Sequence, residues 1–278
     1  RPLKSYGMID KEKCFLNFAP NEGTRMEINI VRFDMALGHQ KPENIIHREN
    51  GCPFCHPETL TDIIAREEEF IFLRNKYNVL DDADQFVLVE AATCDIDTPD
   101  YPPGHLARLL RFSLRQWRLL ENSGKYTAVI FFKNHGHLSG GTMRHPHMQI
   151  VGFRHINPRL LLDRDSFQGI PVVERDGVLL NAATHPRVGF GEFNIIAPPD
   201  KIETFASLLQ TTVGFIRDRF PKSQDSYNLF FYHLDEKLAV KALPRFPTSP
   251  LLIGYDIRLF PSNFEKSIAM LKERCLSL

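Results

Sequence analysis

The chain has 278 residues, the length of one large domain or two modest ones. Its 34 basic and 34 acidic residues cancel, which argues against a general nucleic-acid or membrane-surface binder, because such proteins carry a basic excess. No apolar run approaches the length of a transmembrane helix, so we expect neither nucleic acid nor a membrane as a partner.

Apolar periodicity predicts an order of strands and helices that occurs twice. In the first part, strands are predicted at 15–18 and 27–33, around a turn at 21–23, and at 70–77, 85–90, 126–132 and 150–153, with a helix at 106–120. In the second part, strands are predicted at 191–197, 227–233 and 251–259, with helices at 201–220 and 263–276. This recurrence indicates a structural duplication.

Cys52 and Cys55 lie in a CxxC knuckle that is punctuated by glycine and proline. The chain has five cysteines, an odd number, and no signal-like apolar stretch near its start. We therefore expect a reducing, cytoplasmic setting without disulfides. In that setting the CxxC spacing predicts metal ligation by the two thiolates.

The segment 140–152 begins with two glycines and continues into two histidines that flank a proline. Alternate side chains of an extended segment share a face, so His145, His147 and Gln149 are predicted to lie on one face. Pro146 favours an extended conformation at the preceding residue and makes this presentation rigid. Two imidazoles and an amide beside a Gly-Gly turn suit nucleophilic or metal chemistry on a phosphate. The same pattern also fits hydrogen-bonded core histidines next to an ordinary turn.

Taken together, four motifs resemble galactose-1-phosphate uridylyltransferase and its relatives in the histidine-triad (HIT) superfamily. They are the Cys52–Cys55 knuckle, Asn134-His-Gly136, Gly140-Gly-Thr142 and His145-Pro-His147-Met-Gln149, with a weaker fifth at Ile253-Gly254-Tyr255-Asp256. The resemblance implies an α+β fold of two tandem HIT-like repeats, with a mostly antiparallel sheet (half-barrel) and flanking helices. It implies an N-terminal arm at 1–44 that packs on the body, a first repeat at 45–155 with the zinc knuckle and the nucleophile, and a second repeat at 156–278.

The resemblance also implies a role for each matching residue. His147 matches the family nucleophile, which attacks the α-phosphorus of a nucleoside diphosphate sugar and forms a nucleotidyl-histidine intermediate. Gln149 matches the amide that hydrogen-bonds the phosphoryl oxygens. The positions that match nucleotide- and phosphate-binding residues are Asn75, Asn134, Gly140, Gly141 and Thr142, and those on the sugar side are Tyr255 and Asp256.

One structural zinc ion per chain is a further implication of the resemblance, with Cys52, Cys55 and His145 as ligands. The fourth ligand of familiar members is a histidine, and Cys94 stands at the matching position here. A set of three cysteines and one histidine suits tetrahedral zinc. His56 is the alternative fourth ligand, although its adjacency to Cys55 makes the geometry awkward.

The predicted function is a nucleotidyltransferase that moves a nucleoside monophosphate from a nucleoside diphosphate sugar to a sugar phosphate or to inorganic phosphate. Ser249 and Pro250 stand where the uridylyltransferase has a basic residue for the hexose phosphate, so the acceptor stays open. The alternatives are a HIT-type nucleotide hydrolase or phosphorylase, and a non-catalytic, zinc-stabilised nucleotide-binding protein. The resemblance is compatible with a homodimer.

Overall fold

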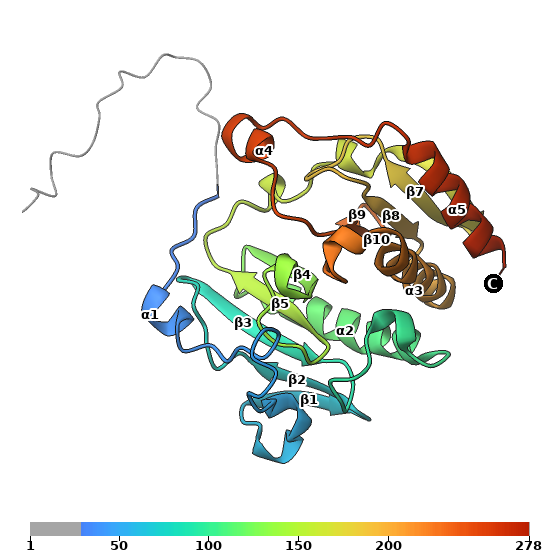
Figure 1. Cartoon of the computed structure of the whole chain (residues 1–278). Coiled ribbons are helices and arrows are strands. Elements are labelled where there is room, and N and C mark those ends of the chain that lie inside the picture. The colour runs from blue at the N-terminus through green and yellow to red at the C-terminus, as the bar shows by residue number, and fades with distance from the viewer. Residues whose placement is uncertain (1–28, 278) are drawn as a thin grey trace, which may run out of the picture.

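The structure, a computed structural model, describes residues 29–277 (Figure 1). Within this part of the chain, ten strands form one sheet in the order β1-β2-β3-β5-β4-β9-β10-β8-β7-β6, and all neighbours are antiparallel. The strands are β1 (Ile63–Glu67), β2 (Phe70–Arg74), β3 (Ala83–Val89), β4 (Ala128–His135), β5 (His147–Phe153), β6 (Gly169–Arg175), β7 (Val178–Ala183), β8 (Phe193–Ala197), β9 (Tyr227–Leu234) and β10 (Lys237–Pro244). The predicted α+β fold with a mostly antiparallel sheet is confirmed.

The two halves of the sheet repeat one strand order. The first half runs β1-β2-β3-β5-β4, and the second runs β6-β7-β8-β10-β9 when it is read from its outer edge. The halves meet where β4 pairs with β9, and there Phe131 lies opposite Phe231. The two rings stack with their centroids 4.3 Å apart. The duplication is therefore built into a single continuous sheet.

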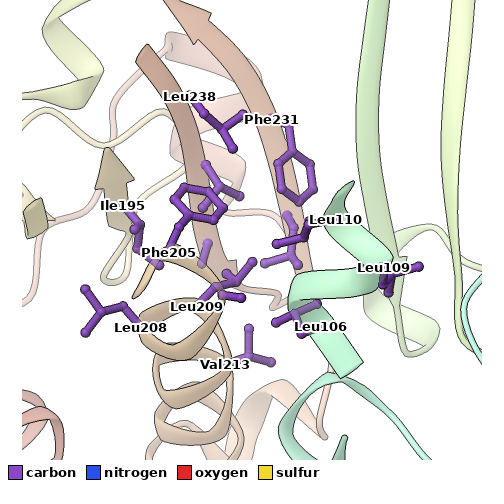
Figure 2. Packing of buried hydrophobic residues seen from close by; sticks show 14 of the residues in the cluster. Leu106, Leu109, Leu110, Ile195, Phe205, Leu208, Leu209, Val213, Phe231 and Leu238 are labelled. Atoms are coloured by element: carbon purple, nitrogen blue, oxygen red, sulfur yellow. The ribbon is translucent and has the colours of Figure 1, made fainter. Parts of the chain in front are cut away.

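Three helices pack on one face of this sheet: α2 (His105–Glu121), α3 (Ile202–Arg219) and α5 (Phe264–Leu276). Figure 2 shows Leu106 and Leu110 of α2 close to Leu209 and Val213 of α3, and all four are buried. Burying such apolar side chains contributes roughly 1.5–3 kcal/mol each, so this layer is a main source of stability. Among the described residues, no helix has the length and apolar character needed to cross a membrane.

The opposite face of the sheet carries polar and aromatic side chains. On β4, Phe131 and Lys133 are fully buried in the body, whereas their neighbours Phe132 and Asn134 line a cavity on the other side. This alternation follows from the two-residue period of a strand. The candidate site lies on this cavity-bearing face.

Two predicted strands are not found. Instead of a strand at 251–259, the structure has a helix, α4 (Pro250–Tyr255), in which Ser249 caps the backbone N–H of Leu251 and proline takes the first position. Both are helix-start signals, and they outweigh the apolar run. Of the strand at 27–33, the described part has only one bridge, from Phe33 to Leu80, just before the short helix α1 (Met35–Gly38). The strand at 15–18 and the turn at 21–23 lie outside the described residues.

The sequence prediction missed four strands. In β1, Ile63 and Ile64 are both partly exposed, so alternation is weak. The β6 pairing is irregular near Pro171. In β7 and β10, consecutive residues are buried on both faces of the sheet, so no two-residue period is visible.

We expect Phe131→Ala to lower the free energy of unfolding by about 3–5 kcal/mol, because it empties the buried stack between the two halves. Urea denaturation would measure the change. The matched control is Leu119→Ala on α2, where the side chain is 61% exposed and the expected change is within about 0.5 kcal/mol. Equal losses of unfolding free energy in the two variants would show that the Phe131–Phe231 stack does not stabilise the contact between the two halves of the sheet.

Candidate functional site

The candidate site is a cavity of about 670 Å³ at one end of β3, β4 and β5. His147 is the first residue of β5, where it pairs with Val89 of β3. The sequence-predicted residues that line this cavity are Asn75, Asn134, Gly140, Gly141, Thr142, His147 and Gln149. The structure thus brings these seven residues together from three separate stretches of the chain.

A backbone contact fixes the proton position on the His147 ring. Its Nδ1 lies 2.8 Å from the carbonyl oxygen of His145, and since a carbonyl only accepts, Nδ1–H is the donor. In the neutral ring, Nε2 therefore carries the lone pair, and it is the nitrogen left for the cavity. This is the tautomer that a nucleophilic imidazole needs.

Burial lowers the pKa of His147 to about 4, and the nearby charge of Lys133 adds to the effect. The ring is only 7% exposed. Phe54 packs against it with a centroid distance of 5.8 Å. At neutral pH the ring is therefore uncharged and ready to donate its lone pair.

A bend after β4 forms the polar wall of the cavity. Gly140 has a φ of +86°, a left-handed conformation that glycine adopts at no steric cost. Among the described residues, the backbone N–H groups of Gly140 and Thr142 have no acceptor, whereas that of Gly141 donates to Ser139 Oγ at 3.2 Å. Free N–H groups next to a left-handed turn form a concavity that suits an anion.

The charge of the cavity lining is entirely positive. Lys41, Arg74 and Lys76 line it, and no aspartate or glutamate of the described residues does so. Burial lowers the pKa of Lys41, which lies partly inside the wall. The remaining wall is apolar and comes mainly from Phe33, Phe54, Leu60, Leu73, Val79, Leu80 and Val87. Such a lining suits a ligand with an anionic end and a flat or apolar end.

Beside the cavity, four ligand atoms form a compact cluster. The sulfurs of Cys52, Cys55 and Cys94 and a nitrogen of His145 all lie within 4.8 Å of one another. His145 Nδ1 is 3.4–3.5 Å from each of the three sulfurs. Its Nε2–H donates a hydrogen bond to the carbonyl oxygen of Ala91 at 2.8 Å. In the neutral ring, Nδ1 therefore carries the lone pair that can bind a metal ion. This buried Cys3His cluster can bind one metal ion.

The chemistry of the cysteine thiols in this cluster favours a bound cation. Burial raises the pKa of both Cys52 and Cys94, so without a positive charge these thiols stay protonated. A bound metal ion supplies that charge and displaces the protons. His56, the alternative ligand, lies outside the cluster and pairs with Glu58 at 3.3 Å. Cys275 is buried in α5, and Cys14 lies outside the described residues.

A buried ionic network supports the strand ends under the site. Lys133 Nζ contacts Glu90 Oε2 and Asp97 Oδ1, each at 2.7 Å. Burial acts to raise the pKa of Asp97, but the charges of Lys133 and His135 hold it below its usual range. The backbone N–H of Glu90 also donates to the carbonyl oxygen of Pro146, between the two histidines. The network therefore ties β3 and β4 to the segment that carries His147.

Some predicted residues are not brought to the site. Tyr255 ends α4 with 76% of its surface exposed, and Asp256 follows it and pairs with Arg258. Neither lines the His147 cavity. His135, the middle residue of the Asn134-His-Gly136 motif, does not line the cavity either, because its ring lies between Asp97 and Tyr227.

Sequence reasoning missed two asparagines that hold the site. Asn44 is buried, and its Oδ1 accepts the backbone N–H of Arg144 at 2.7 Å. Asn228 of β9 donates to Asn134 Oδ1 at 2.6 Å, from the other half of the sheet. Both contacts span about a hundred residues, and neither asparagine belongs to a recognisable motif.

Comparisons with known proteins place the chain in a family. Models for the N-terminal and C-terminal domains of a domain of unknown function, DUF4931, match residues 33–156 and 160–276. A solved structure of a DUF4931 family protein from Bacillus cereus ATCC 10987 is 40% identical to this chain, with a TM-score of 0.70. The match covers 77% of this chain and 99% of that chain. No curated protein matches the sequence.

More distant structures share the fold. An ADP-glucose phosphorylase from Arabidopsis thaliana with bound ADP-glucose is 14% identical over 87% of this chain and 94% of that chain, with a TM-score of 0.65. A uridylyltransferase is 17% identical over 82% of this chain and 92% of that chain, with a TM-score of 0.63. At these identities the likeness shows a common fold.

We expect purified protein to carry about one zinc ion per chain, and we expect Cys94→Ser to lose most of it, because three ligands hold the metal far more weakly than four. Elemental analysis would measure the zinc content. The matched control is Cys275→Ser, a buried cysteine outside the cluster, which should keep wild-type content. Full zinc content in Cys94→Ser would contradict the assignment.

Proposed function

This chain is a member of the DUF4931 family, and from the geometry of its own site we propose that it is a nucleotidyltransferase that works through His147. It moves a nucleoside monophosphate from a nucleoside diphosphate sugar to a sugar phosphate or inorganic phosphate. The observation that carries this proposal is the unprotonated Nε2 of His147 in a cavity whose described lining has no carboxylate and includes a bend with free N–H groups.

The proposed reaction has two displacements at one phosphorus atom. In the first, the lone pair of His147 Nε2 attacks the α-phosphorus of the donor, and the bond from that phosphorus to the bridging oxygen breaks. The sugar 1-phosphate leaves with the electron pair. The Nδ1–H of the ring, which donates to the carbonyl oxygen of His145, stabilises the positive charge that develops on the imidazole.

In the second displacement, an oxygen of the acceptor phosphate attacks the same phosphorus, and the bond to Nε2 breaks. The electron pair returns to the ring. Gln149, Asn134 and the bend at 140–142 are proposed to donate hydrogen bonds to the nonbridging oxygens in both steps. Lys41, Arg74 and Lys76 neutralise the phosphates, and the apolar wall takes the base.

The metal cluster has a structural role in this proposal. Cys52, Cys55, Cys94 and His145 would fill all four positions of a tetrahedral zinc ion and leave none for substrate. The ion would fix His145, whose carbonyl oxygen holds His147. In the same proposal, the repeat at 45–155 carries the chemistry and the repeat at 156–278 completes the sheet. Of the arm predicted at 1–44, residues 1–28 lie outside the described part of the chain.

Two alternatives can be separated by product analysis. A hydrolase must remove a proton from the attacking water, and no carboxylate of the described residues lines the cavity to take it. A phosphate acceptor is already an anion and needs no such base. A hydrolase would release nucleoside monophosphate without added phosphate, and a non-catalytic binding protein would bind nucleotide without turnover.

We expect wild-type protein incubated with labelled UDP-glucose or ADP-glucose to form an acid-labile nucleotidyl-protein, and His147→Gly to form none, because the attacking nitrogen is gone. The label is measured on protein separated under alkaline conditions. The matched control is His155→Gly, an exposed histidine outside this cavity, which should label normally. Label that survives in His147→Gly, or a wild-type protein that takes label from neither donor, would reject the proposal.

We expect Gln149→Ala to slow formation of the labelled protein by roughly 10²–10³-fold, the usual cost of losing one donor to a developing oxyanion. Gln149→Glu should be slowed at least as much, because it replaces the donor with a negative charge of similar shape. Rapid-quench labelling would give the rates, and zinc content would serve as the check on folding. A rate within about threefold of wild type for Gln149→Ala would show that the amide does not touch the reacting phosphate.

A further inference from the structure

A second cavity, of about 810 Å³, lies beside the first. Phe132 and Asn134 of β4 line both cavities. The rest of its wall comes from both halves of the chain, including Trp117 and Glu121 of α2 and Phe230 and Tyr232 of β9. The donor chemistry proposed above leaves this space without an assigned ligand.

Arg245 lies in the wall of the second cavity, directly after β10. Its Nη1 donates to Asn228 Oδ1 at 2.6 Å. Among the described residues its guanidinium has no other hydrogen-bond partner and no ion pair, and its Nε is buried without a partner. Burial lowers the pKa of this guanidinium, which has no acid to offset the cost. A half-buried cation with a buried, unpartnered Nε–H and no counter-charge indicates a missing anion.

No acid in the wall of this cavity is free to pair with Arg245, and the other arginine and the lysine there, Arg187 and Lys241, already bond to groups of the protein. Glu121, the acid in the cavity wall, pairs with His233 at 3.1 Å. Lys241 is fully buried next to Glu192 and also donates to the carbonyl oxygen of Ser166 and to the side chain of Asn194. The lysine is thus neutralised within the protein, whereas Arg245 is not.

Arg245 is linked to the site of the chemistry through two side-chain amides. Asn228 accepts from Arg245 through Oδ1, and through Nδ2 it donates to Asn134 Oδ1 at 2.6 Å and to the carbonyl oxygen of Ser139 at 3.2 Å. Asn134 and Ser139 belong to the segment that forms the bend in front of His147. An anion held by Arg245 would therefore be connected through Asn228 to Asn134, which lines both cavities.

We propose that the second cavity is the acceptor subsite, in which the phosphate group of an organic phosphate monoester pairs with Arg245 and its organic part occupies the space against Phe230 and Tyr232. The role of this subsite as the acceptor site rests on the proposed function. Binding of the phosphate to Arg245 does not require catalysis. The same subsite would hold the sugar phosphate that leaves in the first displacement. The leaving group and the later acceptor both occupy the side of the phosphorus atom that faces away from His147.

The size and lining of the cavity favour an organic phosphate over inorganic phosphate. A volume of about 810 Å³ is that of a site for a small organic ligand and far exceeds a single phosphate ion. The aromatic side chains Phe132, Phe230 and Tyr232 offer flat apolar surface, which stacks well on sugar or base rings. Inorganic phosphate would contact only the guanidinium end.

The test measures binding and transfer separately. Calorimetric titration of glucose 1-phosphate, AMP and inorganic phosphate would be compared among wild type, Arg245→Met, Arg245→Lys and Arg219→Met. Arg219 is an exposed arginine at the end of α3, outside both cavities, and it controls for loss of one positive charge. We expect Arg245→Met to weaken binding of the organic phosphates roughly 10- to 100-fold, the cost of one charge-assisted pair. Arg245→Lys should recover part of it, because lysine restores the charge without the bidentate fork.

In the second arm, each protein is labelled to completion with donor, and release of the label is followed against acceptor concentration. Arg245→Met should label fully, should release label to saturating acceptor, and should need a correspondingly higher concentration of glucose 1-phosphate or AMP. If no protein takes label but Arg245→Met alone loses organic phosphate binding, the proposed function fails and the anion site stands. If wild type binds neither organic phosphate, or Arg245→Met binds them and discharges label as wild type does, the subsite is overturned.

Discussion

The proposed chemistry depends on one residue, His145, which contacts both parts of the site. Its ring nitrogen faces three cysteine sulfurs, and its carbonyl oxygen holds the ring of His147 at 2.8 Å. The cluster therefore sets the position of a backbone carbonyl, and that carbonyl sets both the tautomer and the direction of the second imidazole. A metal ion bound there would act on catalysis through orientation alone.

Burial creates the electrostatic conditions for this arrangement. A neutral imidazole at physiological pH requires a low pKa, and exclusion from water supplies it at His147. The same burial would be costly for Lys133 and Asp97 if each were alone, but they form a pair under the strand ends. The site thus has fixed charges below the sheet, a neutral histidine at its edge, and the cations Lys41, Arg74 and Lys76 in its wall.

The joint between β4 and β9 gives the second half of the sheet a part in the site. The aromatic stack of Phe131 on Phe231 holds the two strands together on the helix side. On the other side, Asn228 connects Asn134 with Arg245. In the proposed function, the two halves of the duplicated fold therefore have different roles. The first half carries the nucleophile, and the second carries a cation for a second substrate.

The sequence by itself determined the local features. The spacing of His145, His147 and Gln149 fixes which side chains share a face, and apolar periodicity gave α2, α3 and α5 nearly to the residue. These properties depend only on neighbours along the chain. Only the tertiary structure decided that Cys94 rather than His56 joins the cluster, that 250–255 is helical, and that Asn44, Asn228 and Arg245 reach the site region. The cluster and the contacts of Asn44 and Asn228 join segments about fifty to a hundred residues apart, and Arg245 reaches the site region through Asn228. A lone cysteine, asparagine or arginine carries no periodic signal for such contacts.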